Sequence, residues 1–560
     1  MQPGRPRMLP FALATALIVA ISAIVRRPGF TEGGLASHDV GGILYNAMLL
    51  RSGGLPYVDS VEWKAPGSFY LAALLAGPEG TDIAALQIAA NCVALGSLAL
   101  VAVLAWRLWG PAAALTAAAV FALHDAHLDS MDANYVTWAL LPQLAAVLVA
   151  VLADRRRRAQ PVPSAMSSTA SQASGAPDDA DPQPVPSRRS FTASQASGTP
   201  DNADPQPVPS RRSFGTWLMA GVLCAAATLC KQPDGIVLVP VLAHALFAGP
   251  RRDLRSGLAV LLGFLGGHAV VGAHYLAHGQ LGALVASYTG INWGIAYIGH
   301  HADTPLRSAA WEGAAASLYF LALPLVLAGF AIAARPREPS PETRATLRLL
   351  AIWSAAALVS AAVGLRFYKG YFLAVLPPLC LLAAAPWGLL SAATWRRGLA
   401  RWFAAPVLAL LVARAALQLH ATRVDRAHPH DDGARKIAAH IARHSQPGDR
   451  IWVWGWHLWG VYAYSDRLSA SPLYKTPGLL TRFDNDTWRR PSTPVQFIPD
   501  SPHAARLLRD LEAAPPIFIA LGGTVPREQF TGLRRFLAAR YERDRRIQVG
   551  KVEIWRRRET

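Results

Sequence analysis

The stretch SHDVGGILYNAMLLRSGGLPYVDSVEWKAPGSFYLAALL, residues 37–75, directly follows the first apolar run of the chain. It places two aspartates, Asp39 and Asp59, in a loop that also contains Gly, Pro, Trp and Tyr. Gly and Pro are typical of turns, and Trp and Tyr are typical of the membrane–water interface. We therefore expect this loop to lie against a membrane, where a carboxylate is costly unless it is used or paired.

Apolar runs recur along the rest of the chain. It has 560 residues, of which 52% are hydrophobic, and its mean hydropathy is +0.24. Each run is near the ~20 residues that a helix needs to cross a bilayer, so we expect a polytopic α-helical membrane protein with about eleven spans. The expected spans are 8–25, 83–106, 111–124, 134–153, 215–230, 236–249, 256–277, 311–334, 347–364, 371–392 and 402–419.

Positive charge is unevenly distributed between the expected loops. The net charge is +18, arginines cluster beside apolar runs, as at 155–158, and no nucleic-acid-binding motif accompanies them. Basic residues gather on the cytoplasmic side of membrane proteins. We therefore expect a cytoplasmic N-terminus, an extracytoplasmic C-terminal region and no nucleic-acid partner. Arg26 and Arg27 are exceptions, because they fall on the outer side.

Two regions lie outside the apolar pattern. Residues 154–214 are rich in Pro, Ser, Ala and Asp, and the unit SQASGAPDDADPQPVPSRRSF at 171–191 recurs almost unchanged at 194–214. Such a tract buries too little apolar surface to fold, which predicts a disordered cytoplasmic linker, with a regulatory or docking arm as the alternative. Residues 420–560 mix helix-like and strand-like segments, which predicts a soluble α/β domain.

The expected organisation therefore has four parts. A first membrane part with the first outer loop covers 1–153, the linker covers 154–214, a second membrane part covers 215–419, and the soluble domain covers 420–560. Within the soluble domain we expect a helix at 434–444 and strands at 450–454, 516–521 and 547–555.

Asp39 has two interpretations. A carboxylate at this place could act as a general base that takes a proton from an acceptor hydroxyl. Alternatively it is a solvated loop residue or the N-cap of a helix over 40–50, because Asp is a good N-cap and Ile43, Ala47 and Leu50 have helical spacing.

Other charged residues of the same loop follow a Gly-Pro turn. Asp59, Glu62 and Lys64 lie on the return toward the membrane. Asp59 could hold a metal ion or orient Lys64, and an ordinary surface ion pair is equally compatible with the sequence.

Two basic motifs are expected at the outer ends of later spans. Lys231 lies in the motif KQP, and Arg366 and Lys369 lie in the motif RFYKGY. Cations at a membrane surface suit a phosphate group, to which Arg offers a bidentate fork and Lys a point charge. Side chains that snorkel at helix ends are the alternative.

A polar segment, HDAHLDSMD at 124–132, is also expected outside. His and Asp at this density can bind a metal ion, but the spacing matches no metal motif, which favours a polar outer loop.

Several of these segments together resemble the bacterial membrane glycosyltransferases of the GT-C class. The resemblance is strongest to family 39, the group of protein mannosyltransferases and aminoarabinose transferases. It covers most of the chain except 154–214. It rests on Asp39 with GGLPYVDSVEWKAPGSFYLAALL (53–75), CKQPDGIVLVP (230–240), RFYKGYFLAVLPPLCLL (366–382) and IWVWGWHLWGVYAYSDRLSAS (451–471).

The resemblance implies a GT-C fold in the bacterial inner membrane and a site on its outer face. It implies inverting transfer of a sugar from a polyprenyl-phosphate donor to an envelope glycan, lipid or protein, with Asp39 as the base. The donor phosphate is then expected on Lys231, Arg366 and Lys369. The acceptor side is expected to be shaped by His38, Asp59, Glu62, Lys64 and Tyr368.

Two positions depart from the family pattern. Many relatives have Asp-Glu where this chain has Asp39 and Val40, and many carry an acidic residue at the start of the fourth span. Asp132 is the residue expected to take the place of that acidic residue. The sequence does not decide between a site with a bound divalent metal ion and a site without one.

Two other classes of function are compatible with the sequence. A transporter or flippase of lipid-linked glycans would show internal repeats of spans and charged or broken helices at the midplane, and no such repeat is evident. A binding or scaffold protein without activity is the third interpretation, because of the two departures.

Overall fold

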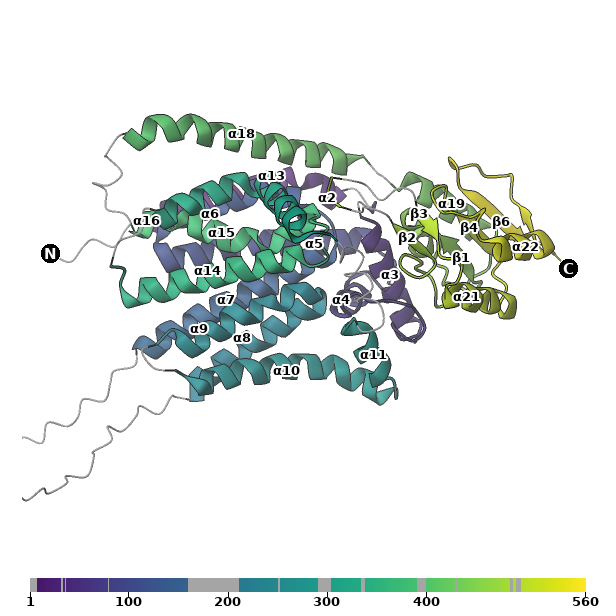
Figure 1. Cartoon of the computed structure of the whole chain (residues 1–560), viewed down its shortest axis with the longest axis horizontal. Coiled ribbons are helices and arrows are strands. Elements are labelled where there is room, and N and C mark those ends of the chain that lie inside the picture. The colour runs from purple at the N-terminus through teal and green to yellow at the C-terminus, as the bar shows by residue number, and fades with distance from the viewer. Residues whose placement is uncertain are drawn as a thin grey trace, which may run out of the picture.

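The computed structural model describes residues 8–31, 34–35, 37–78, 80–159, 211–249, 252–290, 304–333, 338–389, 399–428, 431–483, 487–489 and 495–559. A bundle of helices carries a smaller α/β part at one end (Figure 1). The predicted linker lies largely outside the described residues. At its edges, α7 continues to Ala159 and α8 begins at Arg211.

Apolar helices form the bundle. In the described part of the chain, six helices are long and apolar enough to cross a membrane: α5 (Ile83–Trp109), α7 (Tyr135–Ala159), α10 (Leu254–Ala277), α13 (Leu306–Ala333), α14 (Pro341–Ala362) and α18 (Leu399–Ala427). Shorter apolar helices are α1 (Met8–Val25), α6 (Pro111–His124), α8 (Arg211–Cys230), η2 (Gln232–Val237) with α9 (Leu238–Phe247), and α15 (Leu376–Ala384) with α16 (Pro386–Leu389). Each predicted span coincides with one of these, which confirms the helical membrane class, while the number of crossings stays a prediction.

One end of the bundle is held together by arginines. Arg157 joins the end of α7 to the start of α10 through Asp253, at 3.3 Å, and Arg155 lies 3.8 Å from Glu342 at the start of α14. These helix ends lie at the opposite end of the bundle from the α/β part (Figure 1). The arginine-rich ends therefore share one face, as the positive-inside pattern requires.

Short helices cover the other end of the bundle. They are α2 (Arg27–Thr31), α3 (His38–Arg51), α4 (Gly67–Leu75), η1 (Ala126–Ser130), α11 (Leu281–Tyr288) and η3 (Lys369–Ala374). Arg26, just after α1, is fully buried, forms an ion pair with Asp125 and donates to the carbonyl of Ser130 at 2.8 Å. Arg26 is an exception to the charge pattern because it is part of this buried network.

The C-terminal part is a sheet with helices on both faces. Its elements are α19 (Asp432–Arg443), β1 (Ile451–Trp454), η4 (Trp456–Leu458), α20 (Gly460–Ser465), β2 (Thr481–Phe483), β3 (Val495–Phe497), α21 (Pro502–Ala513), β4 (Phe518–Leu521), α22 (Thr531–Arg540), β5 (Tyr541–Arg543) and β6 (Glu553–Arg557). The four-stranded sheet has the order β1-β4-β6-β5, in which β1 and β4 are parallel and the other pairs are antiparallel.

The side chains of β1 point alternately to the two faces of the sheet, which explains why helices pack on both sides of it. Ile451 and Val453 pack in one cluster with α19, whereas Trp452 and Trp454 pack in another with α21 and α22. Successive side chains of a strand point to opposite faces, so a strand covered on both sides is apolar throughout.

The predicted elements of this domain are largely confirmed. The helix at 434–444 corresponds to α19, and the strands at 450–454 and 516–521 correspond to β1 and β4. The strand at 547–555 was placed too early, because the chain turns at Gly550, with φ of 51°, and β6 begins at Glu553. Helix α18 also continues past the predicted boundary at 420, to Ala427.

Candidate active site

Helix α3 carries Asp39 in its first turn. Ser37 is the N-cap, and its hydroxyl oxygen accepts from the backbone N–H of Asp39 at 3.3 Å. Asn134 donates to the same hydroxyl at 3.0 Å. The N-cap interpretation of Asp39 is therefore wrong, because Ser37 holds that position. The Asp39 side chain is 34% exposed and lines a cavity.

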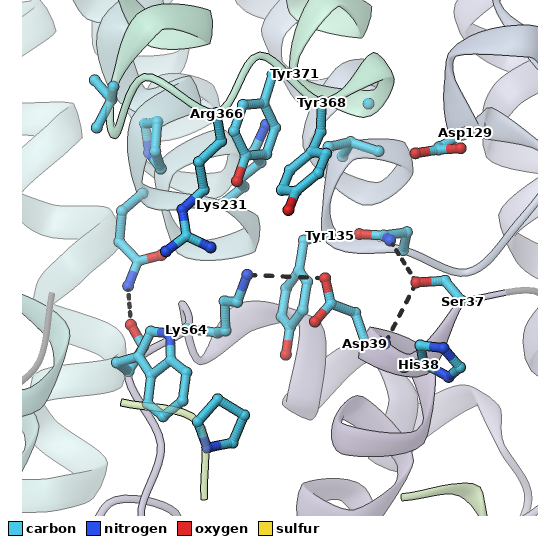
Figure 2. A pocket seen from close by; sticks show the side chains of 18 of the residues that line it. Ser37, His38, Asp39, Lys64, Asp129, Tyr135, Lys231, Arg366, Tyr368 and Tyr371 are labelled. Carbon is cyan, nitrogen blue, oxygen red and sulfur yellow. Dashed lines mark hydrogen bonds and ion pairs between the residues drawn. The ribbon is translucent and has the colours of Figure 1, made fainter. Parts of the chain in front are cut away.

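This cavity has a volume of about 600 Å³ and lies where the bundle meets the C-terminal part. In Figure 2, Asp39 and Lys64 approach from the first outer loop, and Arg366 and Tyr368 approach from the opposite wall. The C-terminal part contributes Trp456, Trp459, Lys475 and Pro477 to the lining. A ligand in the cavity would thus contact both parts of the chain.

Positive side chains predominate on the cavity wall. The lining contains five Lys or Arg side chains, at 64, 231, 366, 369 and 475, against two acidic ones, Asp39 and Asp129. Lys64 lies 3.8 Å from Asp39, and Lys369 lies 2.9 Å from Asp129. Lys231 and Lys475 are also paired, with Asp234 at 3.2 Å and Glu62 at 2.5 Å, outside the lining. The five cations thus meet four carboxylates, and the remaining excess of positive charge favours an anionic group.

Arg366 is presented by a strained turn. Leu365 and Phe367, on either side, have φ of 53° and 52°, a conformation that residues with a side chain rarely adopt. The carbonyl of Arg366 accepts from the backbone N–H of Trp488 at 2.9 Å, and its side chain is 2% exposed. Such strain persists only where the surroundings enforce it, often at functional sites.

Electrostatics keep Asp39 ionised. Burial raises the pKa of its carboxyl, but the positive charge of Lys64 opposes this effect. Lys475, His38 and Lys231 contribute in the same direction as Lys64, and the pKa of Asp39 lies below its ordinary value. The carboxylate is therefore available as a proton acceptor at neutral pH.

Comparison with known proteins gives matches to solved structures. No protein-family model matches the sequence, and no curated protein matches it either. The structure is similar to ArnT from Cupriavidus metallidurans in the apo state, with a TM-score of 0.54, 12% identity and coverage of 96% of this chain and 97% of that chain. ArnT bound to undecaprenyl phosphate gives a TM-score of 0.53 at 13% identity and the same coverage. The apo oligosaccharyltransferase from Archaeoglobus fulgidus gives 0.51 at 12% identity, covering 90% of this chain and 69% of that chain. The chain has the GT-C fold.

Within this GT-C fold, seven of the nine site residues predicted from the sequence line one cavity. They are His38, Asp39, Lys64, Lys231, Arg366, Tyr368 and Lys369. They come from three segments far apart in the sequence: the first outer loop, the residue after α8, and the turn that leads into the first residue of η3. Their convergence agrees with the sequence prediction of a common site, and their chemical roles stay predictions.

Asp59 and Glu62 are not part of the cavity lining. The carboxylate of Asp59 accepts from the backbone N–H of Leu55 at 2.7 Å and closes a turn. Glu62 is fully buried behind the wall, 2.5 Å from Lys475. Both carboxylates are used in hydrogen bonding within the protein, and their role in shaping the acceptor side stays a prediction.

The acidic residue of segment 124–132 that lines the cavity differs from the one expected. Asp132 is buried and accepts from Gln87 at 2.5 Å, and burial raises the pKa of its carboxyl to about 6. Asp129 lines the cavity instead. It belongs to η1 and has a φ of 70°. Asp129, and not Asp132, therefore lines the cavity, and the role of a second acidic site stays a prediction.

Sequence reasoning missed the contributions of the C-terminal part. Trp456 lies in a motif that supported the resemblance, and its ring stacks on His38 with centroids 6.2 Å apart. Lys475 lies outside all the motifs, in a segment without periodicity, so no pattern in the sequence distinguishes it from a surface lysine.

The described residues of the lining do not fit a divalent metal ion. Each of its two carboxylates is paired with a lysine, and lysine donates hydrogen bonds but has no lone pair to offer while charged. Among the described residues, no group of three or more His, Cys, Asp or Glu side chains could hold a metal ion. We therefore assign no step of the chemistry to a metal.

Proposed function

We propose that this protein is a membrane glycosyltransferase. It moves a sugar from a polyprenyl-phosphate donor to a hydroxyl group of an envelope glycan, lipid or protein, on the outer face of the bacterial inner membrane. The observation that carries the proposal is an ionised Asp39 in a cavity whose opposite wall presents Arg366 and Lys231.

The charge of the cavity supports a phosphate ligand. Arg366, Lys231 and Lys369 come from segments at the ends of bundle helices, where a lipid tail can remain among apolar side chains. Arg binds phosphate through two parallel N–H groups, and Lys adds a point charge. Two structures of the same fold hold such a lipid, ArnT with undecaprenyl phosphate and the Archaeoglobus oligosaccharyltransferase with a dolichol-phosphate.

The proposed chemistry is a single displacement. The acceptor oxygen attacks the anomeric carbon of the donor, and the bond from that carbon to the phosphate oxygen breaks. The acceptor proton passes to the Asp39 carboxylate, and the polyprenyl phosphate leaves with the electron pair of the broken bond. One displacement inverts the anomeric centre. The cationic wall stabilises the negative charge that develops on the leaving phosphate.

The orientation is also part of the proposal. Helix ends with arginines lie at the far end of the bundle from the cavity. If these ends are cytoplasmic, the cavity and the C-terminal part lie outside. Alkaline phosphatase fused after the C-terminus would then be active, and the same enzyme inserted within 160–210 would be inactive.

Mass analysis of envelope glycolipids and glycoproteins tests the function. A strain that lacks this protein should lose one sugar modification, which the wild-type gene restores and the Asp39→Asn gene does not. The matched control is Asp59→Asn, which changes a carboxylate of the same loop outside the cavity lining and should restore the modification. Unchanged glycosylation in the deletion strain would contradict the proposal.

A further inference from the structure

Glu62 connects the first outer loop to the C-terminal domain. Its Oε1 accepts from the backbone N–H groups of Trp63, at 2.9 Å, and Lys64, at 3.1 Å. Its Oε2 accepts from Nζ of Lys475, at 2.5 Å, and from the hydroxyl of Tyr474, at 2.6 Å. One carboxylate therefore holds the backbone that carries Lys64 and two side chains of the other domain.

Lys475 reaches Glu62 through a closely fitted passage. Its Nζ lies 4.8 Å from the ring centroid of Trp459 and 5.5 Å from that of Trp63. A Cβ atom at Gly42 of α3 would lie 2.7 Å from Cε of Lys475, so a larger residue there would displace the end of the Lys475 side chain. The Lys475 side chain is only 1% exposed, yet it borders the cavity that contains Asp39.

Two side chains that act on Asp39 thus depend on one buried pair. Lys475 is itself a member of the pair, and the backbone N–H of Lys64 is fixed by Glu62. The groups that face Asp39 from the surrounding elements are His38 and Lys64 of the first outer loop, Lys231 after α8, Tyr135 of α7 and Lys475 of the C-terminal domain.

We propose that the Glu62–Lys475 pair is a positioning element of the active site. Through it, the docked C-terminal domain keeps the Lys64 ammonium beside the Asp39 carboxylate. The inference rests on the proposed function, because Asp39 is the base of that reaction. The competing interpretation is that the pair only fastens the two domains together.

A double variant measures what the pair contributes to stability. Removing one partner of a buried ion pair leaves an uncompensated charge, whereas replacing both with neutral groups is tolerated. Glu62→Gln keeps an oxygen for the two N–H groups, and Lys475→Met fills the aromatic passage without charge. We expect a lower melting temperature for Glu62→Gln alone and recovery in the double variant. The control is Arg534→Met with Glu553→Gln, which neutralises a pair of 3.2 Å outside the cavity lining.

The measurement is modification of Asp39 by a carbodiimide and an amine over a pH series, read by peptide mass spectrometry. Carbodiimides react with protonated carboxyl groups, so modification rises with the pKa. The exposed Asp466 is the internal reference. Lys475→Met also removes a charge that lowers the pKa of Asp39 directly, so the positioning role is judged on Tyr474→Phe, which keeps both charges of the pair. In this variant, Asp39 modification at a fixed pH should rise at least about threefold, equivalent to half a pKa unit. Asp466 modification and the control variant should not change.

Wild-type modification of Asp39 in folded Tyr474→Phe protein would overturn the proposal. Tyr474→Phe removes the hydrogen bond to Glu62 and also the one that Asn46 donates to the Tyr474 hydroxyl at 2.8 Å. Binding of undecaprenyl phosphate to the wild type is measured in parallel. Absence of that binding would count against the proposed function, whereas the modification data judge the positioning role on their own.

Discussion

Arg366 offers the sharpest test of donor binding. It is 2% exposed, it lines the cavity, and a turn with two left-handed residues presents it. Arg366→Gln keeps a polar side chain but removes the charge and the bidentate fork. A hydrogen bond to a charged group contributes roughly 1.5–3 kcal/mol. We therefore expect about 10- to 150-fold weaker binding of undecaprenyl phosphate.

The assay is titration of the purified protein with undecaprenyl phosphate in detergent micelles, followed by tryptophan fluorescence. Three tryptophans, Trp63, Trp456 and Trp459, line the cavity and can report binding. The control is Arg482→Gln, an exposed arginine outside the cavity lining that donates to Gln496 at 3.0 Å. If folded Arg366→Gln protein binds the lipid as tightly as the control, Arg366 does not contact the phosphate and the snorkelling interpretation stands.

Three further predictions follow from the charges and the sequence. Lys64→Met removes a charge that lowers the pKa of Asp39, so the carboxylate protonates at higher pH and the acidic limb of the pH–rate profile shifts to higher pH. An unchanged acidic limb would show that Lys64 does not affect the pKa of the base. Arg26→Met leaves Asp125 as a buried uncompensated charge, which should cost about 3–5 kcal/mol of stability in thermal unfolding, and adding Asp125→Asn should restore most of it. Deletion of 171–193, one copy of the repeat, should leave membrane yield and activity near wild type, and loss of either at normal expression would assign the tract a specific role.

The membrane fold was predictable because its main determinant is local. Each apolar run that is long enough for a span directly predicts a helix. Strands β1 and β4 are buried on both faces, so their sequences are apolar without interruption and predict strands. The basic motifs around Lys231 and Arg366 were also predictable, since turn residues and cations at the ends of apolar runs stand out against the surrounding sequence.

The supporting interactions were not predictable, because they join residues that are remote in sequence. Glu62 and Lys475 are separated by 413 positions and meet only when the C-terminal domain docks. Asp39 and Ser37 are both acceptable N-caps, and only the fold shows that Ser37 has that role. Asp129 and Asp132 likewise belong to one polar segment, and only the fold shows that Asp129 lines the cavity.

The most direct test of the proposed mechanism is turnover by Asp39→Asn protein with the sugar donor and acceptor that the envelope analysis identifies. Asparagine keeps the size of the side chain but cannot take the acceptor proton at neutral pH. We expect a folded protein that binds undecaprenyl phosphate like the wild type and transfers sugar on the order of 10²–10⁴ times more slowly. A rate above about a tenth of the wild-type rate would contradict the assignment of Asp39 as the base, since loss of general-base catalysis costs more than that.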